Sequence, residues 1–118
     1  MNATLNERSG EVTFKGDPMT LLGTLPTIGE SVPNVTLVDN DLNQKEITDF
    51  TGKKLILVAV PSLDTGVCDT EARRFNQEAT KLDNVTVAVI SRDLPFAQAR
   101  WCGQANAENV FTLSDYRE

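Results

Sequence analysis

Two cysteines, Cys68 and Cys102, are the residues of this chain best suited to chemistry. A cysteine thiolate is a strong nucleophile and can be oxidised, so the pair could react with an oxidant and then with each other. The sequence contains no histidine, which excludes cysteine–histidine dyads, serine–histidine–aspartate triads and most zinc sites. Because two cysteines alone make a poor metal site, we expect neither a metal nor a cofactor.

The sequence around Cys68 predicts a strand, a loop and the first turn of a helix. The apolar run Lys54–Val60 is followed by Pro61 and is typical of a buried parallel strand. Asp64 and Thr65 are both residue types that cap helices. The apolar stripe that predicts the helix consists of Cys68, Ala72, Phe75, Ala79 and Leu82.

A cysteine in the first turn of a helix is placed for reactivity. Free backbone N–H groups and the helix dipole stabilise a thiolate there, and can lower a cysteine pKa of about 8.5 toward or below neutrality. Thr65 can direct its hydroxyl to the same point, and Pro61 can stiffen the loop and exclude water. The alternative is that Cys68 is a small apolar residue of a buried stripe, the usual state of a free cysteine. Its position favours the reactive interpretation.

Cys102 by itself is best explained as a buried structural residue. As a partner of Cys68 it has a chemical role, because a sulfenic acid condenses with a nearby thiol to form a disulfide. A disulfide requires the two Cα atoms to lie within roughly 7 Å, which spacing in the sequence does not establish. The short helix between Pro95 and Gly103 would unwind easily if the two cysteines had to approach.

The remaining elements predict an α/β fold with parallel strands. We expect a polar leader over residues 1–10, then one domain over residues 11–118 that opens with a hairpin turning at Gly16–Pro18. Short strands are expected over residues 35–38, 85–90 and 110–113, and a short helix over residues 94–101, capped by Asp93 and ended by Gly103. Such folds place their chemistry in loops after the carboxyl ends of strands, where Cys68 lies.

Composition excludes several classes of function. The 118 residues carry a net charge of -6, which disfavours nucleic acid and anionic membranes as partners. No apolar run approaches the roughly 20 residues of a membrane span. The first residues lack the basic start and apolar stretch of a secretory signal. We therefore expect a cytoplasmic protein whose thiols are kept reduced.

Six blocks of the sequence resemble the bacterial thiol peroxidase branch of the peroxiredoxin family. They are residues 61–68 (PSLDTGVC), 74–77 (RFNQ), 90–98 (ISRDLPFAQ), 102–103 (CG), 109–114 (NVFTLS) and the hairpin segment 14–18 (FKGDP). The first block is similar to the loop of the peroxidatic cysteine, whose core is a proline, a threonine or serine, and a cysteine. The resemblance extends over residues 11–118.

The resemblance implies an activity and a role for each site residue. Cys68 would be the peroxidatic cysteine, and Cys102 the resolving cysteine that forms an intrachain disulfide with it. Thr65 would hydrogen-bond the peroxide or the thiolate, and Pro61 would shield the pocket. Hydrogen peroxide and organic hydroperoxides would be the substrates, thioredoxin the reductant and a homodimer the assembly. The implied fold is thioredoxin-like with an added N-terminal hairpin.

The sequence is shorter than the members of this family. They continue with a helix, two antiparallel strands and a final helix, and that part carries an arginine that holds the thiolate and the peroxide. The edge of the sheet beside Leu55–Val60 is therefore expected to be open.

Two functions are alternatives to a peroxidase: an inactive thioredoxin-like module that only folds or dimerises, and a general disulfide oxidoreductase. The latter is disfavoured because such proteins carry a close Cys-x-x-Cys pair.

Overall fold

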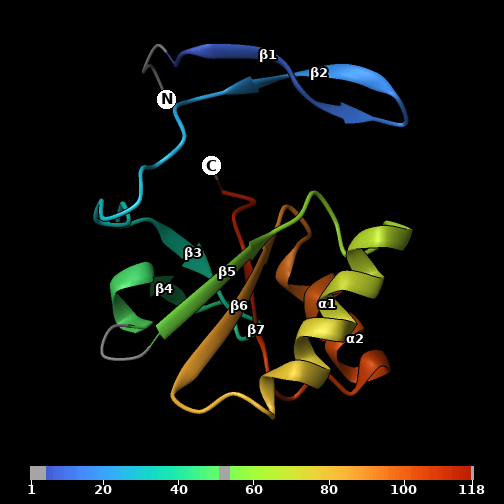
Figure 1. Cartoon of the computed structure of the whole chain (residues 1–118). Coiled ribbons are helices and arrows are strands. Elements are labelled where there is room, and N and C mark those ends of the chain that lie inside the picture. The colour runs from blue at the N-terminus through green and yellow to red at the C-terminus, as the bar shows by residue number, and fades with distance from the viewer. Residues whose placement is uncertain (1–4, 51–53, 118) are drawn as a thin grey trace. The chain divides into compact units, whose positions relative to one another are not determined.

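A computed structural model describes residues 5–50 and 54–117 of the chain (Figure 1). The chain forms two compact units, residues 1–32 and residues 33–118. Residues 1–4 of the leader expected over residues 1–10 lie outside the described residues. Within the described part, no helix is long and apolar enough to cross a membrane.

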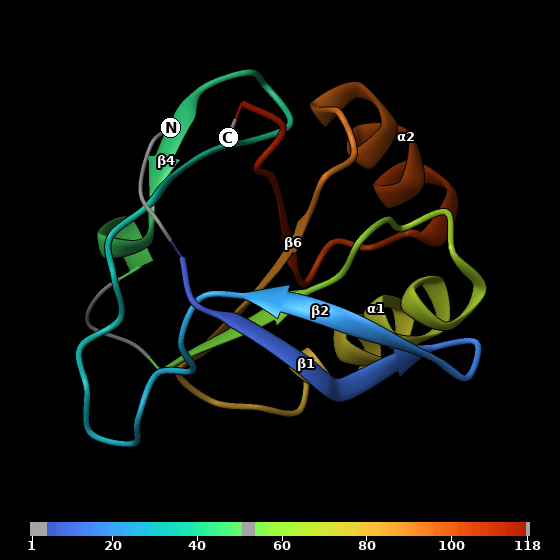
Figure 2. The same cartoon turned by 90° about the horizontal axis from the view of Figure 1, so that it is seen from above.

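The first unit is an antiparallel hairpin of strands β1 (Glu7–Phe14) and β2 (Asp17–Leu22), a twisted ribbon in Figure 2. Strand β1 begins at Glu7, so residues 7–10 belong to the hairpin and not to a leader. The register shifts between Ser9 and Val12, and Gly10 has a φ of 75°. This bulge interrupts the alternation of side chains and hides the start of the strand in the sequence.

The turn of the hairpin is tighter than the sequence predicted. Lys15 and Gly16 have φ angles of 52° and 87°, the left-handed conformation of both central residues in a two-residue hairpin turn. The expected turn over Gly16–Pro18 is therefore wrong, because Asp17 and Pro18 already belong to β2 and pair with Phe14 and Thr13.

The second unit is a five-stranded sheet in the order β4-β3-β7-β6-β5. Strands β5 (Lys54–Ala59), β6 (Val85–Ser91) and β7 (Phe111–Ser114) are parallel neighbours. Strand β3 (Thr36–Val38) is antiparallel to both β7 and β4 (Gln44–Glu46). The expected strand, helix, strand, helix, strand layout with parallel strands is confirmed for β5, β6 and β7, whereas β3 and β4 make the whole sheet a mixed one. This α/β core agrees with the thioredoxin-like fold that the resemblance implied.

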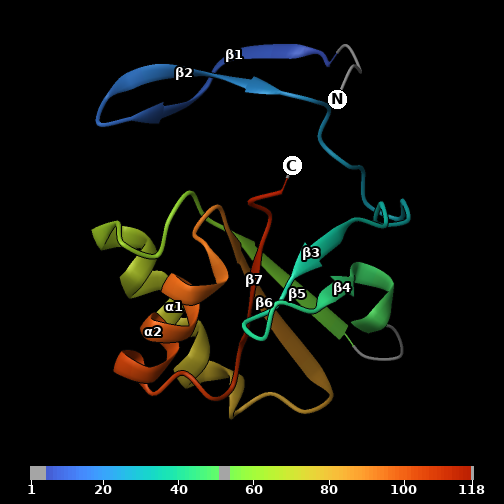
Figure 3. The same ribbon diagram turned by 180° about the vertical axis from the view of Figure 1, so that it is seen from behind.

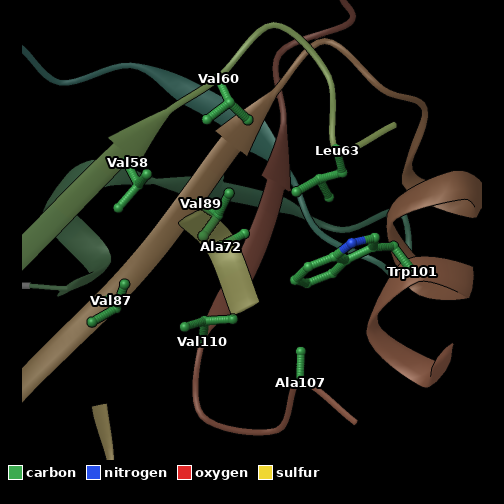
Figure 4. Packing of buried hydrophobic residues seen from close by; sticks show 9 residues of the cluster. All are labelled: Val58, Val60, Leu63, Ala72, Val87, Val89, Trp101, Ala107 and Val110. Atoms are coloured by element: carbon green, nitrogen blue, oxygen red, sulfur yellow. The ribbon is translucent and has the colours of Figure 1, made fainter. Parts of the chain in front are cut away.

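Helices α1 (Gly66–Ala79) and α2 (Pro95–Ala105) connect the parallel strands and cover one face of the sheet (Figure 3). Trp101 of α2 and Ala72 of α1 meet the valines of β5 and β6 in one core cluster (Figure 4). The opposite face carries a second cluster of buried residues, which consists of Leu37, Ile47, Ala88 and Leu113. Ile47 belongs to the 3-10 helix η1 (Ile47–Phe50).

Strand β5 corrects one prediction and confirms another. It lies at the end of the strand order, so this edge is open in the described part of the chain, as expected. The same position makes the prediction of a buried strand wrong, since Leu57 is 37% exposed and Ala59 is also exposed. A continuous apolar run indicates burial on both faces but does not show whether a neighbour exists on both sides.

Candidate active site

Cys68 lies in the first turn of α1, as the sequence predicted. The helix begins at Gly66, and Thr65 is its N-cap residue with extended φ and ψ angles of -87° and 143°. The N–H groups of the first helical residues have no partner within the helix and leave a local positive potential. The Cys68 side chain is half-buried and packs against the core cluster between the helices and the sheet.

Thr65 does not cap α1 with its side chain, which corrects the expectation for this residue. Its hydroxyl donates a hydrogen bond of 2.8 Å to the Ser62 carbonyl, and its backbone N–H donates to the same oxygen over 3.3 Å. The Thr65 hydroxyl proton is therefore engaged, and its oxygen keeps the capacity to accept a hydrogen bond. Asp64, the other expected cap, is exposed.

The loop of residues 61–65, called the Cys68 loop from here on, is held by the segment between β6 and α2. Pro61 is exposed, and its carbonyl accepts the Arg92 N–H over 3.3 Å. The Asp93 carboxylate accepts the Ser62 hydroxyl over 2.7 Å and the Leu63 N–H over 2.8 Å. The prediction that Asp93 caps α2 is wrong, because the N-cap of that helix is Leu94 and it has no side-chain cap.

Cys102 lies in the last turn of α2 and is half-buried. The helix continues to Ala105 and ends at Asn106, which has a left-handed φ of 52°. Gly103 was expected to end the helix but is part of it. Asparagine tolerates the left-handed conformation, so it can end a helix in place of glycine.

Two polar residues outside α2 contact the Cys102 thiol. The Thr112 hydroxyl lies 3.4 Å from its Sγ, and the Asn40 side-chain amide donates to Sγ over 3.8 Å. Because the Thr112 hydroxyl itself donates to Asn40 Oδ1 over 2.9 Å, the Cys102 S–H is the donor in its contact with Thr112. All three residues line a hollow of about 590 Å³ with Phe50 and Phe111 in its wall.

A hydrogen bond connects the neighbours of the two cysteines. The indole N–H of Trp101, which precedes Cys102, donates to Asp69 Oδ1 over 2.6 Å, and Asp69 follows Cys68. Arg73 donates to the same oxygen over 2.9 Å, and its guanidinium lies 5.8 Å from the centre of the Trp101 ring. The indole N–H and then Arg73 hold the pKa of Asp69 below its usual value of 3.8.

The ionised Asp69 should stabilise the fold at neutral pH. A depressed carboxyl pKa contributes stability above its unfolded value, and the contribution is lost as the pH falls through the folded value. Asp69→Asn should therefore lower the free energy of unfolding at pH 7 by about 1 kcal/mol, and by less near pH 3. Urea unfolding followed by the fluorescence of Trp101, the only tryptophan, measures both values.

Asp83→Asn is the matched control for this prediction. Asp83 is an exposed carboxylate after α1, and a change there should leave the free energy of unfolding near the wild-type value at both pH values. An equal loss of stability at pH 7 and pH 3 in Asp69→Asn would contradict the proposed electrostatic contribution of Asp69.

Pro61 and Thr65 lie in the Cys68 loop, Cys68 follows in the first turn of α1, and both cysteines pack against one core cluster. Sequence reasoning missed the contacts of Asp93, Asp69 and Thr112, because each partner lies in a different loop, helix or strand. One signal of a functional role was present in the sequence: Asp93 follows the carboxyl end of the strand expected over residues 85–90, where such folds place their chemistry. Among the described residues, no group of three or more histidine, cysteine or acidic side chains could hold a metal ion.

Comparisons with known proteins place this arrangement in a family. The sequence profile of the redoxin family matches residues 27–118. The chain is 54% identical over 107 residues to a thiol peroxidase of Oceanobacillus iheyensis, covering 91% of this chain and 65% of that protein. It is 52% identical over 108 residues to a thiol peroxidase of Bacillus subtilis, covering 92% of this chain and 65% of that protein.

Solved structures agree with the sequence relatives. A peroxiredoxin-like protein from Aquifex aeolicus superposes with a TM-score of 0.82 at 39% identity, over 98% of this chain and 66% of that one. A thiol peroxidase from Chromobacterium violaceum gives a TM-score of 0.79 at 22% identity, over 99% of this chain and 65% of that one, and shows the shared fold. The chain spans 65% of the length of the first curated relatives that it matches.

Proposed function

Because this chain belongs to the redoxin family, within which it is similar to proteins named thiol peroxidase, we propose that it reduces hydrogen peroxide and organic hydroperoxides. Cys68 is the proposed nucleophile and Cys102 the proposed resolving residue. The observation that carries the proposal is the position of Cys68 in the first turn of α1, directly after a loop held by hydrogen bonds.

In the proposed first step, the Cys68 thiolate attacks one peroxide oxygen. An S–O bond forms as the O–O bond breaks, and the departing oxygen takes a proton and leaves as water or an alcohol. The product is a sulfenic acid at Cys68. Thr65, whose own proton is engaged by Ser62, accepts a hydrogen bond from the peroxide, and Pro61 shields the thiolate from water.

In the proposed second step, Cys102 resolves the sulfenic acid. Its thiol loses a proton, its sulfur attacks the Cys68 sulfur, and the hydroxyl of the sulfenic acid leaves as water to give the disulfide. Cys102 must first leave its contacts with Thr112 and Asn40. The last turn of α2, which carries Cys102, opens for this step.

The cycle closes when a dithiol reduces the disulfide by exchange. Thioredoxin is the proposed reductant, which places the protein in a reducing compartment such as the cytoplasm. We further propose a homodimer as the assembly, neither nucleic acid nor membrane as a partner, and one thioredoxin-like domain whose hairpin begins at Glu7 and not at the expected residue 11.

The rate of Cys68 oxidation tests this function. The fully reduced chain is mixed with hydrogen peroxide or cumene hydroperoxide, quenched at intervals with a thiol-alkylating reagent, and analysed by mass spectrometry. We expect oxidation much faster than that of free cysteine, ending in a Cys68–Cys102 disulfide. A rate equal to that of free cysteine would instead favour the alternative, a thioredoxin-like module without catalysis.

A further inference from the structure

The carboxylate of Asp93 joins the Cys68 loop to the segment that leads into α2. Its Oδ1 accepts the Ser62 hydroxyl over 2.7 Å, and its Oδ2 accepts the Leu63 N–H over 2.8 Å. Oδ2 also accepts the Ser91 hydroxyl over 2.8 Å. One side chain thus satisfies two donors of the loop and one donor at the end of β6.

Hydrogen bonds from buried residues also hold Asp93 in place. Ser91 is 1% exposed and its hydroxyl also accepts the side-chain amide of Gln98, which is fully buried. The hydroxyl of buried Ser114 donates to the Asp93 carbonyl. Burial alone would raise the pKa of Asp93, but the bonds from Leu63, Ser62 and Ser91 outweigh it and keep the pKa below its usual value. At neutral pH the group is therefore an acceptor at both oxygens.

Hydrogen bonds continue from Asp93 to the helix that carries Cys68. Ser62, bound to Asp93 through its hydroxyl, accepts both the N–H and the hydroxyl of Thr65 with its carbonyl. Thr65 is the N-cap of α1, and its carbonyl accepts the first hydrogen bond of the helix, from Asp69. The Leu63 side chain, 2% exposed, fixes the other side of the loop in the core. Without Asp93, the backbone N–H of Leu63 and the hydroxyl of Ser62 lose the acceptor that orients the loop.

We propose that Asp93 is a positioning residue for Cys68, which fixes the Cys68 loop so that the thiolate and Thr65 meet the peroxide in line for attack. This inference rests on the proposed peroxidase function. Its physical basis is that an error of about 1 Å in the placement of reacting groups can slow a reaction by about 100-fold. General thiol reactivity depends much less on such placement, since a small alkylating reagent can approach from many directions.

The test compares two reactions of Cys68 in the full chain. The rate constants with hydrogen peroxide and with iodoacetamide are measured at pH 7 for the wild type, Asp93→Ala and Asp93→Asn, all in a Cys102→Ser background. Asp93→Ala should lose up to about 100-fold in the peroxide rate and only a few-fold in the alkylation rate. Asp93→Asn should recover part of the loss, because its oxygen still accepts the Leu63 N–H.

Two further variants keep the test decisive. Asp83→Ala removes an exposed carboxylate after α1 and should retain both wild-type rates. Ser62→Ala removes one of the two bonds from the loop to Asp93 and should give an intermediate peroxide rate, even if Asp93→Ala does not fold. Hydrogen exchange at the Leu63 amide should accelerate in Asp93→Ala and, to a lesser degree, in Ser62→Ala.

The outcomes separate this inference from the proposed function. A wild-type peroxide rate no faster than that of free cysteine would overturn the function. A fast wild type with equally fast folded Asp93 and Ser62 variants would overturn only the role of Asp93. Peroxide and alkylation rates that fall together, with no recovery in Asp93→Asn, would also overturn it, because they would indicate a general loss of structure.

Discussion

Replacement of Cys68 by serine should abolish peroxide consumption down to the uncatalysed background. A serine hydroxyl stays protonated at neutral pH and does not attack a peroxide oxygen, so no S–O bond can form. The hydroxyl is close in size to the thiol, and the half-buried first turn of α1 should remain intact. Peroxide remaining over time, with thioredoxin and its reductase present, measures the loss.

Cys102→Ser is the matched control for that experiment. Its first oxidation should proceed at the wild-type rate, since Cys68 and its loop are unchanged, but the product should stop at a sulfenic acid that gains one oxygen in mass. Sustained turnover with thioredoxin should be lost. Unchanged peroxide consumption in Cys68→Ser would contradict the assignment of the nucleophile.

Replacement of Leu113 by alanine should cause a large loss of stability. Leu113 is 1% exposed in strand β7, which lies between β3 and β6, and belongs to the core cluster with Leu37, Ile47 and Ala88. Leucine-to-alanine changes at such sites cost about 2–5 kcal/mol, out of roughly 5–15 kcal/mol for a whole domain. Urea unfolding followed by Trp101 fluorescence measures the change in the free energy of unfolding.

Leu82→Ala makes the same change at a residue that is 44% exposed after α1. It should cost less than about 1 kcal/mol, because little apolar surface is lost and no cavity forms. The sequence predicted that Leu82 is the last residue of the buried stripe of this helix. That prediction is wrong, because Leu82 is exposed and lies beyond the end of α1. Equal losses for the two leucines would contradict the position of Leu113 in the core.

The local patterns of the sequence determined the elements around Cys68. The apolar run of β5, the helical stripe of α1 and the apolar run of β6 each depend on spacing within one segment, and each element was found there. Cys68 was correctly placed in the first turn of α1 for the same reason. Ends of elements were less certain, as at Gly103, because a helix continues past a glycine when packing supports it.

Tertiary structure alone decided which segments meet. Asp93 was expected to cap the next helix, a local contact, but it bonds to a loop 30 residues away in sequence. The Trp101–Asp69 bond and the contact between Cys102 and Thr112 likewise join separate elements. The exposure of Leu57 and Ala59 in β5 likewise depends on which strands flank it. Periodicity reports which face of one segment is apolar, whereas a side chain's polar partner is set by the packing of all segments together.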